Sequence, residues 1–343
     1  MNQTDASQTQ ISPEEPLLQL VNDLNTKAEN LLRQDAYHQS IEIAQSARAL
    51  ANGSEPSQPV YPLGAANALI TIAYCYTLSF QYRDSISLLK KAVQLLSTTD
   101  SARLRCTAYL GLGSLYNLNG DTSTAISYSQ RSIFIAEQND LKFELVDSLI
   151  THSGILYNVG AYDDAEAALI KAQRIAKELN DQRLVSGCLN NLANVYLVKG
   201  KIKQAEATAR SSLALSIYPA RTAYVLDTLG QILIKKGDLL GAAECFQQAI
   251  DNGELAENPS GVVESYMHIA ELFIRSGNYA EAERNLRKSL QIAEKTNTVA
   301  IVHGCHQLLA VLYDALGEPA KAYEHFKKFH DFSEKMRQPT LAA

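Results

Sequence analysis

Two histidines near the end of the chain are the first candidates for chemistry. His303 and His306 form the string HGCH, and His325 and His330 follow them in the sequence. On a helix, a spacing of three places both imidazoles on one face, as a pair of metal ligands requires. His306, however, takes a position that Leu holds in most other copies of a repeated pattern described below. We therefore interpret His306 as a packing residue, and the sequence predicts no metal site.

Other reactive residues give no catalytic arrangement. The sequence contains no GxxxxGK[ST], GxGxxG, GxSxG or HExxH string. His152 takes an apolar position of the same repeated pattern, which predicts a core histidine with satisfied hydrogen bonds. Asp163 and Asp164 are predicted to be solvated charges at the start of a helix. The sequence therefore predicts a protein that is not an enzyme and has no cofactor.

The cysteines indicate neither a disulfide framework nor a zinc site. They number five, an odd count, with no CxxC pair: Cys75, Cys106, Cys188, Cys245 and Cys305. Disulfide frameworks are typical of short secreted chains, and structural zinc needs closely spaced ligands. Each cysteine lies among apolar residues at helical spacing, which predicts buried and inert thiols.

Composition excludes several classes of partner. The 343 residues include 31 Lys and Arg and 37 Asp and Glu, so the formal net charge is −6. A protein that binds nucleic acid normally has a basic face, which disfavours that partner. No run of about 18 apolar residues could span a bilayer, and the N-terminal residues lack the pattern of a secretory signal. We therefore expect a cytoplasmic protein with no nucleic-acid and no membrane partner.

The main feature of the sequence is an internal repeat. The clearest copies begin at Leu112, Leu192, Leu229, Ile269 and Leu309. They read apolar, small, two variable positions, Tyr/Phe/Leu, three variable, Gly, four variable, Ala, and the first two of the eight copies lack the glycine, with Asp35 and Phe80 in its place. The last positions of eight copies are Ser40, Ser85, Ala125, Ala165, Ala205, Ala242, Ala282 and Ala322. Successive last positions are 40 residues apart, apart from one step of 45 and one of 37. This regular period predicts eight repeats.

The pattern also predicts the structure of one repeat. The segment before the glycine has apolar residues at helical period, and the segment after it has an apolar stripe such as Ala165, Leu169 and Ala172. The glycine ends the first helix, because it adopts the left-handed conformation without strain. One helix pair cannot bury both of its faces, so each repeat must stack on the next.

This frame, L-small-x-x-Y-x-x-x-G-x-Y-x-x-A, resembles the tetratricopeptide repeat (TPR). The resemblance extends over residues 17–336, although the chain contains no Trp at the bulky early position. The period of about 40 residues, rather than 34, is typical of the long-period type. The resemblance implies an all-α fold, a right-handed TPR-type α-solenoid of about eight helix-turn-helix repeats.

The range of the resemblance predicts the domain organisation. Residues 1–16 are expected to be a disordered N-terminal segment, 17–336 the TPR array and 337–343 a C-terminal tail. A Pro/Gly-rich insertion at 52–64 separates repeats one and two, and 251–261 is expected to be an open connection.

In the TPR resemblance, the first helix of every repeat lines a concave groove. The groove positions of this sequence carry mainly amides and hydroxyls. The predicted peptide-binding residues are Tyr74, Asn117, Thr151, Tyr157, Asn158, Asn190, Asn191, Asn194, Asp227 and Gln231. An Asn side chain donates and accepts hydrogen bonds and so pairs with the backbone of an extended peptide. The alternative is that an Asn is merely tolerated on a solvated helix face.

Two functions follow. The first is a non-enzymatic protein–protein interaction module that binds an extended peptide or disordered segment in its concave groove. The alternative is a regulatory or sensor TPR module that controls a signalling enzyme in another chain, such as a cyclase, kinase or response regulator. A stripe of Ala322, Phe326, Phe329 and Phe332 packs on its own repeat or docks an identical copy, which leaves self-association through the C-terminal repeat open.

Overall fold

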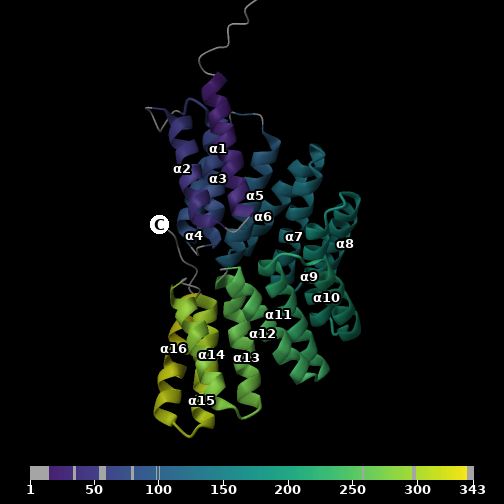
Figure 1. Ribbon diagram of the computed structural model, residues 1–343, viewed down its shortest axis with the longest axis vertical. Helices are drawn as coiled ribbons and strands as arrows, with labels where there is room; N and C mark the ends of the chain where they lie inside the picture. Colours follow the sequence, from purple (N-terminus) through teal and green to yellow (C-terminus); the bar gives the residue numbers. More distant parts are fainter. Residues whose placement is uncertain are drawn as a thin grey trace, which may run out of the picture. The chain divides into compact units, whose positions relative to one another are not determined.

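The structure, a computed structural model, describes residues 15–33, 36–53, 59–78, 81–97, 99, 101–256, 259–295 and 299–337. These residues form sixteen α-helices and no strand, which confirms the all-α prediction. Figure 1 labels the helices. The helices are α1 (Glu15–Arg33), α2 (Tyr37–Asn52), α3 (Pro62–Leu78), α4 (Tyr82–Leu96), α5 (Ala102–Leu118), α6 (Thr122–Gln138), α7 (Lys142–Asn158), α8 (Tyr162–Glu178), α9 (Gln182–Val198), α10 (Ile202–Leu215), α11 (Pro219–Lys236), α12 (Leu239–Leu255), α13 (Pro259–Arg275), α14 (Tyr279–Lys295), α15 (Val299–Ala315) and α16 (Pro319–Arg337). Each odd-numbered helix and its successor form one of the predicted helix-turn-helix repeats.

The chain divides into two compact units. Unit 1 comprises Met1–Thr77 and Gln81–Ala108, and unit 2 comprises Leu78–Phe80 and Tyr109–Ala343. The boundary falls within α5, so that most of α5 and all of α6 to α16 belong to unit 2. That residues 17–336 act as one array stays a prediction.

The repeat frame fixes the helix ends as expected. The glycines that follow the first helices of six repeats have φ angles between 70° and 90°: Gly120, Gly160, Gly200, Gly237, Gly277 and Gly317. At Gly237 the backbone N–H donates to the carbonyls of Leu233 and Ile234, which closes the last turn of α11. A residue with a Cβ would be strained at this φ of 90°, which is why the frame requires glycine there.

Small residues of the frame bring the two helices of a repeat together. In α11, a Cβ added at Gly230 would lie 2.5 Å from Cε1 of Phe246 on α12. Phe246 is fully buried in the core of unit 2, which also contains Leu229, Ile232 and Ile250. The small residue of the frame therefore makes room for the large residue of the partner helix.

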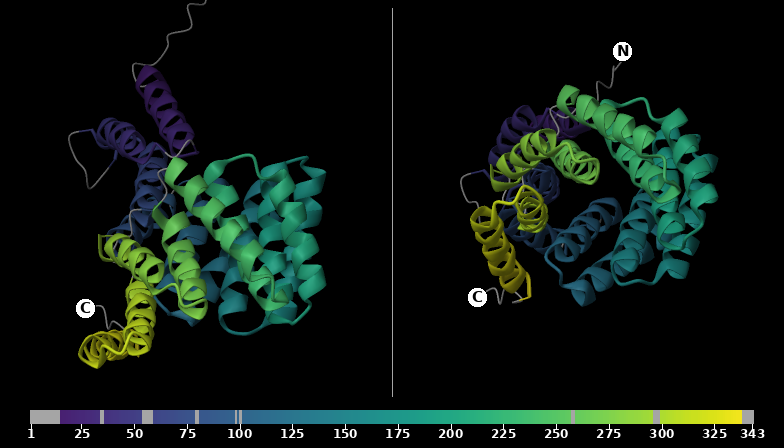
Figure 2. Two further views of the ribbon diagram at one scale, coloured as in Figure 1. Left: turned by 60° about the horizontal axis from the view of Figure 1, so that its bottom comes forward. Right: turned by 90° about the horizontal axis from the view of Figure 1, so that it is seen from below.

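The helices of unit 2 form two layers (Figures 1 and 2). The first helices contact one another in a row, α7 with α9, α9 with α11, α11 with α13 and α13 with α15. The second helices contact the first helices on either side of them, and within the described residues no second helix has comparable contacts with another second helix. Because the first helices are the closer packed layer, their free face is the inner face of unit 2.

Two predicted connections differ from the helix bounds in the structure. The prediction of an open connection at 251–261 is wrong, because α12 continues to Leu255 and α13 begins at Pro259. Gly253 is buried within α12 and Pro259 takes the first helical position, where its missing N–H costs nothing. In the 52–64 insertion, α3 already begins at Pro62, and residues 54–58 lie outside the described part of the chain.

The predicted terminal segments lie mostly outside the described residues. Glu15 and Pro16 belong to α1, and Arg337 ends α16. Residues 1–14 and 338–343 are not among those described.

Candidate functional site

All ten predicted peptide-binding residues lie on first helices. Tyr74 belongs to α3 in unit 1, where its hydroxyl donates to the carbonyl of Thr107 over 3.3 Å. The other nine lie in unit 2, on α5 (Asn117), α7 (Thr151, Tyr157, Asn158), α9 (Asn190, Asn191, Asn194) and α11 (Asp227, Gln231). A side chain already engaged within the protein has less capacity for a ligand, and the nine differ in this respect. The Tyr157 ring, for example, packs edge-on against the ring of Tyr162.

Two amide contacts tie neighbouring first helices together. Asn158 Nδ2 of α7 donates to Asn117 Oδ1 of α5 over 3.1 Å. Asn194 Nδ2 of α9 donates to Thr228 Oγ1 of α11 over 3.3 Å. The row of amides therefore spans adjacent helices, although part of its hydrogen-bonding capacity is used to do so.

The asparagines of α9 differ from these. Asn190 Oδ1 is buried and has no hydrogen-bond partner within the described chain. Asn191, beside it, is half-buried on the same helix. A buried acceptor without a donor costs free energy until an N–H group reaches it, so Asn190 marks a place that suits a ligand donor.

Asp227 is the centre of a buried cluster between α11 and α13. Its Oδ1 accepts hydrogen bonds from Ser265 Oγ over 2.7 Å and from His268 Nδ1 over 3.0 Å, and its Oδ2 accepts one from Gln231 Nε2 over 2.7 Å. Asp227 as a whole residue is only 7% exposed. Asp227 and Gln231, both predicted to bind peptide, thus engage each other and the next repeat.

This cluster shifts the pKa of both ionisable partners. Burial acts to raise the pKa of Asp227, but the hydrogen bond and charge of His268, with the bonds from Ser265 and Gln231, outweigh it and lower the pKa. For His268, burial acts to lower the pKa, and the bond to Asp227 with the charges of Asp227, Glu264 and Glu271 raises it. Both shifts are in the direction that favours an ion pair between the two side chains.

Sequence reasoning missed two charged residues on first helices of unit 2. Asp147 of α7 and Arg221 of α11 lie on either side of α9, and each affects the pKa of the other. Burial raises the pKa of Asp147, against the charges of Arg183 and Arg221, and burial lowers the pKa of Arg221. Asp147 lies five residues before His152, the first position of its copy, so a frame extended by five residues would have included it. Arg221 stands eight residues before Leu229, outside the frame.

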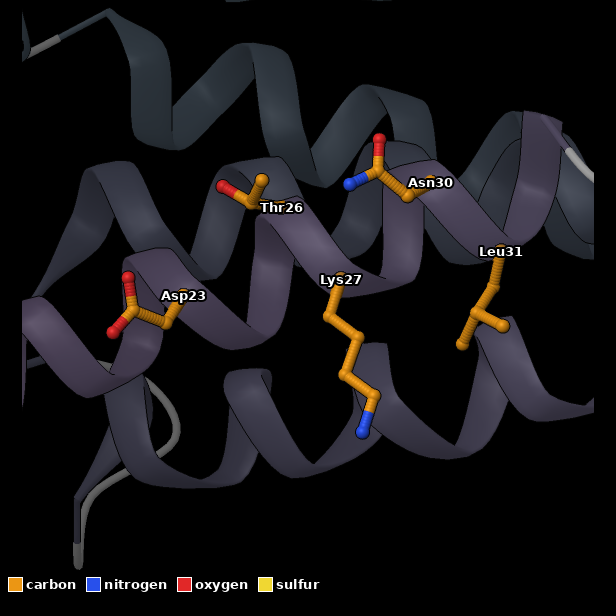
Figure 3. Close-up of a pocket in the computed structure, with 5 residues that line it drawn as sticks. All are labelled: Asp23, Thr26, Lys27, Asn30 and Leu31. Atoms are coloured by element: carbon orange, nitrogen blue, oxygen red, sulfur yellow. The ribbon is translucent and has the colours of Figure 1, made fainter.

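Figure 3 shows a pocket in unit 1. Its lining residues Asp23, Thr26, Lys27, Asn30 and Leu31 all come from α1, at the spacing of one helix face. It contains none of the predicted site residues, so it adds no support to the peptide site.

The reactive residues behave as packing groups. His306 is only 3% exposed, as its place in the frame predicts, and its Nδ1 lies 3.0 Å from Nδ1 of His325. His152 Nδ1 forms a hydrogen bond of 2.9 Å with Ser129. Burial raises the pKa of the Cys188 thiol to about 12 and that of the Cys305 thiol to about 11. In the described residues no three His, Cys, Asp or Glu side chains are placed to hold a metal ion.

The aromatic stripe of α16 faces two ways. Phe332 packs against the core cluster of Val302 and Cys305, and the Phe329 ring lies 4.3 Å from the His303 ring. Phe326, in contrast, is 55% exposed. None of the described helices is both long and apolar enough to cross a membrane.

Comparison with known proteins agrees with the repeat geometry. The family model described as tetratricopeptide repeat matches residues 220–295. These residues are tetratricopeptide repeats. The match covers α11 to α14, where the frame has its glycines at 237 and 277.

One relative of the chain is named as a regulatory protein. The chain is 26% identical to Regulatory protein RapG of Bacillus subtilis over 206 residues, which are 58% of this chain and 55% of RapG. The chain therefore spans about half the length of this relative. Two solved structures share the fold over nearly the whole chain.

The first is the Rap conjugation gene regulator of plasmid pLS20 in complex with the Phr* peptide. Its TM-score is 0.65 at 17% identity, over 94% of this chain and 98% of that one. The second is a Rap protein complexed with competence and sporulation factor. Its TM-score is 0.67 at 15% identity, over 95% of this chain and 100% of that one.

Proposed function

We propose that this protein is a non-enzymatic interaction module that binds an extended peptide or disordered segment on the inner face of unit 2. The observation that carries the proposal is the row of polar side chains on α5 to α11, which includes the unpartnered Oδ1 of Asn190. An extended peptide has backbone N–H and C=O groups that its own chain does not satisfy, and such a row satisfies them. The two Rap structures of the same fold, each in complex with a named peptide or factor, support this reading.

Asn190 and Asn191 are the first residues to test. We expect the full chain to bind members of a random library of linear seven-residue peptides, and we expect the double variant Asn190→Ala/Asn191→Ala to bind the selected peptides at least tenfold more weakly. Fluorescence anisotropy of a labelled selected peptide gives the affinity. The matched control is Gln247→Ala/Gln248→Ala, two adjacent exposed amides on the outer helix α12.

Circular dichroism shows whether each variant remains folded. Failure of the wild-type chain to retain any peptide would refute the proposal. Retention that is equally strong in both double variants would move the site away from α9.

A second candidate is regulation of a separate signalling enzyme, and the similarity to a relative named as a regulatory protein favours it. The two functions are compatible, because a peptide bound on the inner face is then the signal and the enzyme the output. Addition of a selected peptide should change the retention of a partner enzyme on the immobilised chain. An enzyme retained equally with and without peptide would count against this candidate.

Three further expectations stay predictions. We expect a cytoplasmic protein whose residues 17–336 act as one TPR array. Self-association through the C-terminal repeat would use the exposed side of α16, where Tyr323 is 70% exposed and Phe326 55%. A molar mass that does not change with concentration in light scattering would exclude it.

A further inference from the structure

A hollow of about 530 Å3 opens beside the second helix α6 in unit 2. Five of its lining residues come from one face of α6 and one from α5: Ser127, Gln130, Arg131, Phe134, Ile135 and Tyr109. None of them belongs to the predicted peptide-binding residues, which all lie on first helices. The volume is within the range of about 300–1,000 Å3 that ligand-binding pockets occupy, so the hollow has room for several side chains.

Stacked tyrosine rings hold the guanidinium of Arg131 at this hollow. The ring of Tyr128 on α6 stacks with the rings of Tyr109 and Tyr116 on α5, with centroids 5.7 and 5.6 Å apart. The Cζ atom of Arg131 lies 5.9 Å from the centroid of Tyr109 and 5.7 Å from that of Tyr128. Since a guanidinium is attracted to the faces of such rings, the positive charge is held in one place before any ligand arrives.

The same guanidinium has no acceptor in the protein. Within the described part of the chain, Arg131 forms no hydrogen bond and no ion pair. Basic residues at the equivalent position of later repeats each have a partner, namely Lys171 with Glu137, Lys288 with Tyr266 and Lys328 with Glu324. Glu137 is the only other charged residue of α6, and its carboxylate is engaged by Lys171. Arg131 is thus a positive charge whose five N–H donors are left for a carboxylate from outside.

Phe134, one turn further along α6, is 63% exposed. It stands nine residues after the last position of its copy, where the later repeats carry charged, polar or small residues: Arg174, Ala214, Asp251, Gln291 and Asp331. The stacking of a second helix therefore does not require an aromatic residue at this position. A large exposed ring beside an arginine is typical of the residues that dominate binding at protein interfaces.

The chemistry of a ligand follows from this pair. A guanidinium binds a carboxylate with two parallel hydrogen bonds, and an aromatic ring buries an apolar side chain. Arg131 and Phe134 are three residues apart on a helix, so their Cβ atoms are about 5–6 Å apart. An acidic and an apolar residue three or four apart on a second helix have the same spacing, whereas residues on the same face of a strand are about 6.5 Å apart. A helix with an acidic and an apolar residue on one face is therefore complementary to the hollow in both charge and spacing.

We propose that the hollow beside α6 binds an acidic amphipathic helix of a partner protein. A Glu or Asp of that helix pairs with Arg131, and a Leu, Ile or Phe one turn away packs on the ring of Phe134. This site is separate from the inner face, so the chain binds a partner here while a peptide occupies the first helices.

The test uses the full chain and a displayed library of helical peptides of about 20 residues, long enough to be helical alone, in which one face is randomised. We expect the retained peptides to carry Asp or Glu three or four residues from Leu, Ile or Phe. Synthetic versions of one selected peptide with Glu, Gln or Lys at the acidic position then give affinities by fluorescence anisotropy. The Glu peptide should bind the wild type about tenfold more tightly than the Gln peptide.

Arg131→Glu is the decisive variant. It reverses the charge at the hollow, so we expect the order to exchange, with the Lys peptide now binding more tightly than the Glu peptide. A structural role of Arg131 alone would weaken both peptides equally and leave their order unchanged. The matched control is Arg174→Glu, which reverses an exposed arginine on α8 outside the hollow and should preserve the order.

Phe134→Ala examines the apolar half of the site. It should weaken the Glu peptide about tenfold, as expected for an aromatic residue at the centre of an interface. In a double-mutant cycle, replacing the apolar residue of the peptide by Ala should have little further effect once Phe134→Ala is present. Phe143→Ala on α7, a ring that is 49% exposed, is the control. Because the side chains of Arg131 and Phe134 are exposed, circular dichroism should show all variants folded.

The outcomes identify the occupant. A library without enrichment of Asp or Glu, or equal binding by a peptide whose helix is broken by proline, would overturn the proposal. So would equal binding of the selected peptide and its Leu-to-Ala version, which would reduce the hollow to an anion site. Light scattering tests a second copy of the chain: a dimer that Arg131→Glu dissociates would assign the hollow to self-association instead. None of these results affects seven-residue peptides on the inner face, which Arg131→Glu should still bind.

Discussion

Two histidine sites of unit 2 have opposite electrostatic character. His268 of α13 contacts the carboxylate of Asp227 on α11, and its pKa is raised. His306 of α15 contacts the imidazole of His325 on α16, and its pKa is lowered to about 4, first by burial and then by the charges of His325 and Lys328. The first pair joins two repeats, whereas the second lies within the last repeat.

The difference shows that the partner, more than burial, decides the charge of a histidine in this fold. His306 is 3% exposed and the His268 side chain 21%, so both are largely removed from water. A carboxylate partner compensates for burial and an imidazole does not. The stability that the Asp227–His268 pair contributes is therefore lost as the pH rises, and the His306 site destabilises the fold as the pH falls.

Loss of the Asp227 carboxylate should have the largest effect. Asp227→Asn leaves Ser265 and His268 with a weaker acceptor and removes the charge that compensates for His268. We expect a loss of about 3 kcal/mol in the free energy of unfolding at pH 6, as for one broken partner of a buried pair. Urea unfolding followed by circular dichroism measures it.

The control is Asp251→Asn on α12, where the carboxylate is exposed and accepts a hydrogen bond from Gln247. A change within about 0.5 kcal/mol is expected there. Equal losses in the two variants would show that the Asp227 cluster contributes nothing of its own.

Acid should weaken the last repeat through His306. Its folded pKa of about 4 lies below the unfolded value of about 6.5, so below pH 6.5 the unfolded chain binds a proton that the folded chain resists. Stability is then lost as the pH falls from 7 to 4, by about 2 kcal/mol at pH 5. His306→Leu, which installs the residue that repeats five and six carry at this position, should remove this loss.

The measurement is the unfolding midpoint of wild type and His306→Leu between pH 4 and 7. His325, Lys328 and Glu324 on α16, with Arg287 and Glu283 on α14, face the same site and stay unchanged in the variant. Parallel pH profiles of the two proteins would contradict the assignment.

Asn190, unlike the two histidines, has a buried polar atom without a partner among the described residues. The Oδ1 of Asn190 is buried and unpaired within the described residues, so Asn190→Ala removes an unmet acceptor and improves helix propensity. We expect the free energy of unfolding to rise by about 1 kcal/mol while peptide affinity falls. Urea unfolding and anisotropy measure the two quantities on one preparation, and a destabilised variant would mean that the oxygen is bonded in solution.

The repeat frame predicted the fold because its residues act locally, either by ending a helix or by making room for a side chain of the partner helix. Gly237 ends α11 at a φ of 90°, and Gly230 leaves room for Phe246. The role of each glycine could therefore be predicted from the sequence. The connection at 251–261 was mispredicted because its Gly, Asn and Pro residues resemble a loop, whereas stacking buries Gly253 within a helix. Composition reports local preference, and tertiary burial overrides it.

The sequence predicted on which helices the candidate site residues lie, but not which hydrogen-bond partners they have. The frame placed Asn117, Asn158 and Asn194 on first helices, as the structure has them. Which of them already bond within the protein depends on the register between neighbouring helices, as with Asn117 and Asn158, 41 residues apart. Arg221 lies outside the frame and becomes visible only when α11 is placed against α9.

The smallest expected effect is the loss of stability at alkaline pH through His268. The Asp227 carboxylate raises the pKa of His268, so the contribution of the pair is present below the unfolded histidine value of about 6.5 and is lost as the pH rises through the folded value. Because the pKa of Asp227 is lowered, its part is lost only in acid, below the unfolded value of about 3.9. Raising the pH from 6 to 9 should therefore lower the stability of wild type relative to His268→Gln, which keeps a donor for Asp227 but does not titrate. The effect should be smaller than that of His306 in acid, because burial of His268 opposes the carboxylate instead of adding to it. NMR titration of the His268 ring gives the midpoint directly, and a midpoint below that of an exposed histidine would reverse the predicted direction.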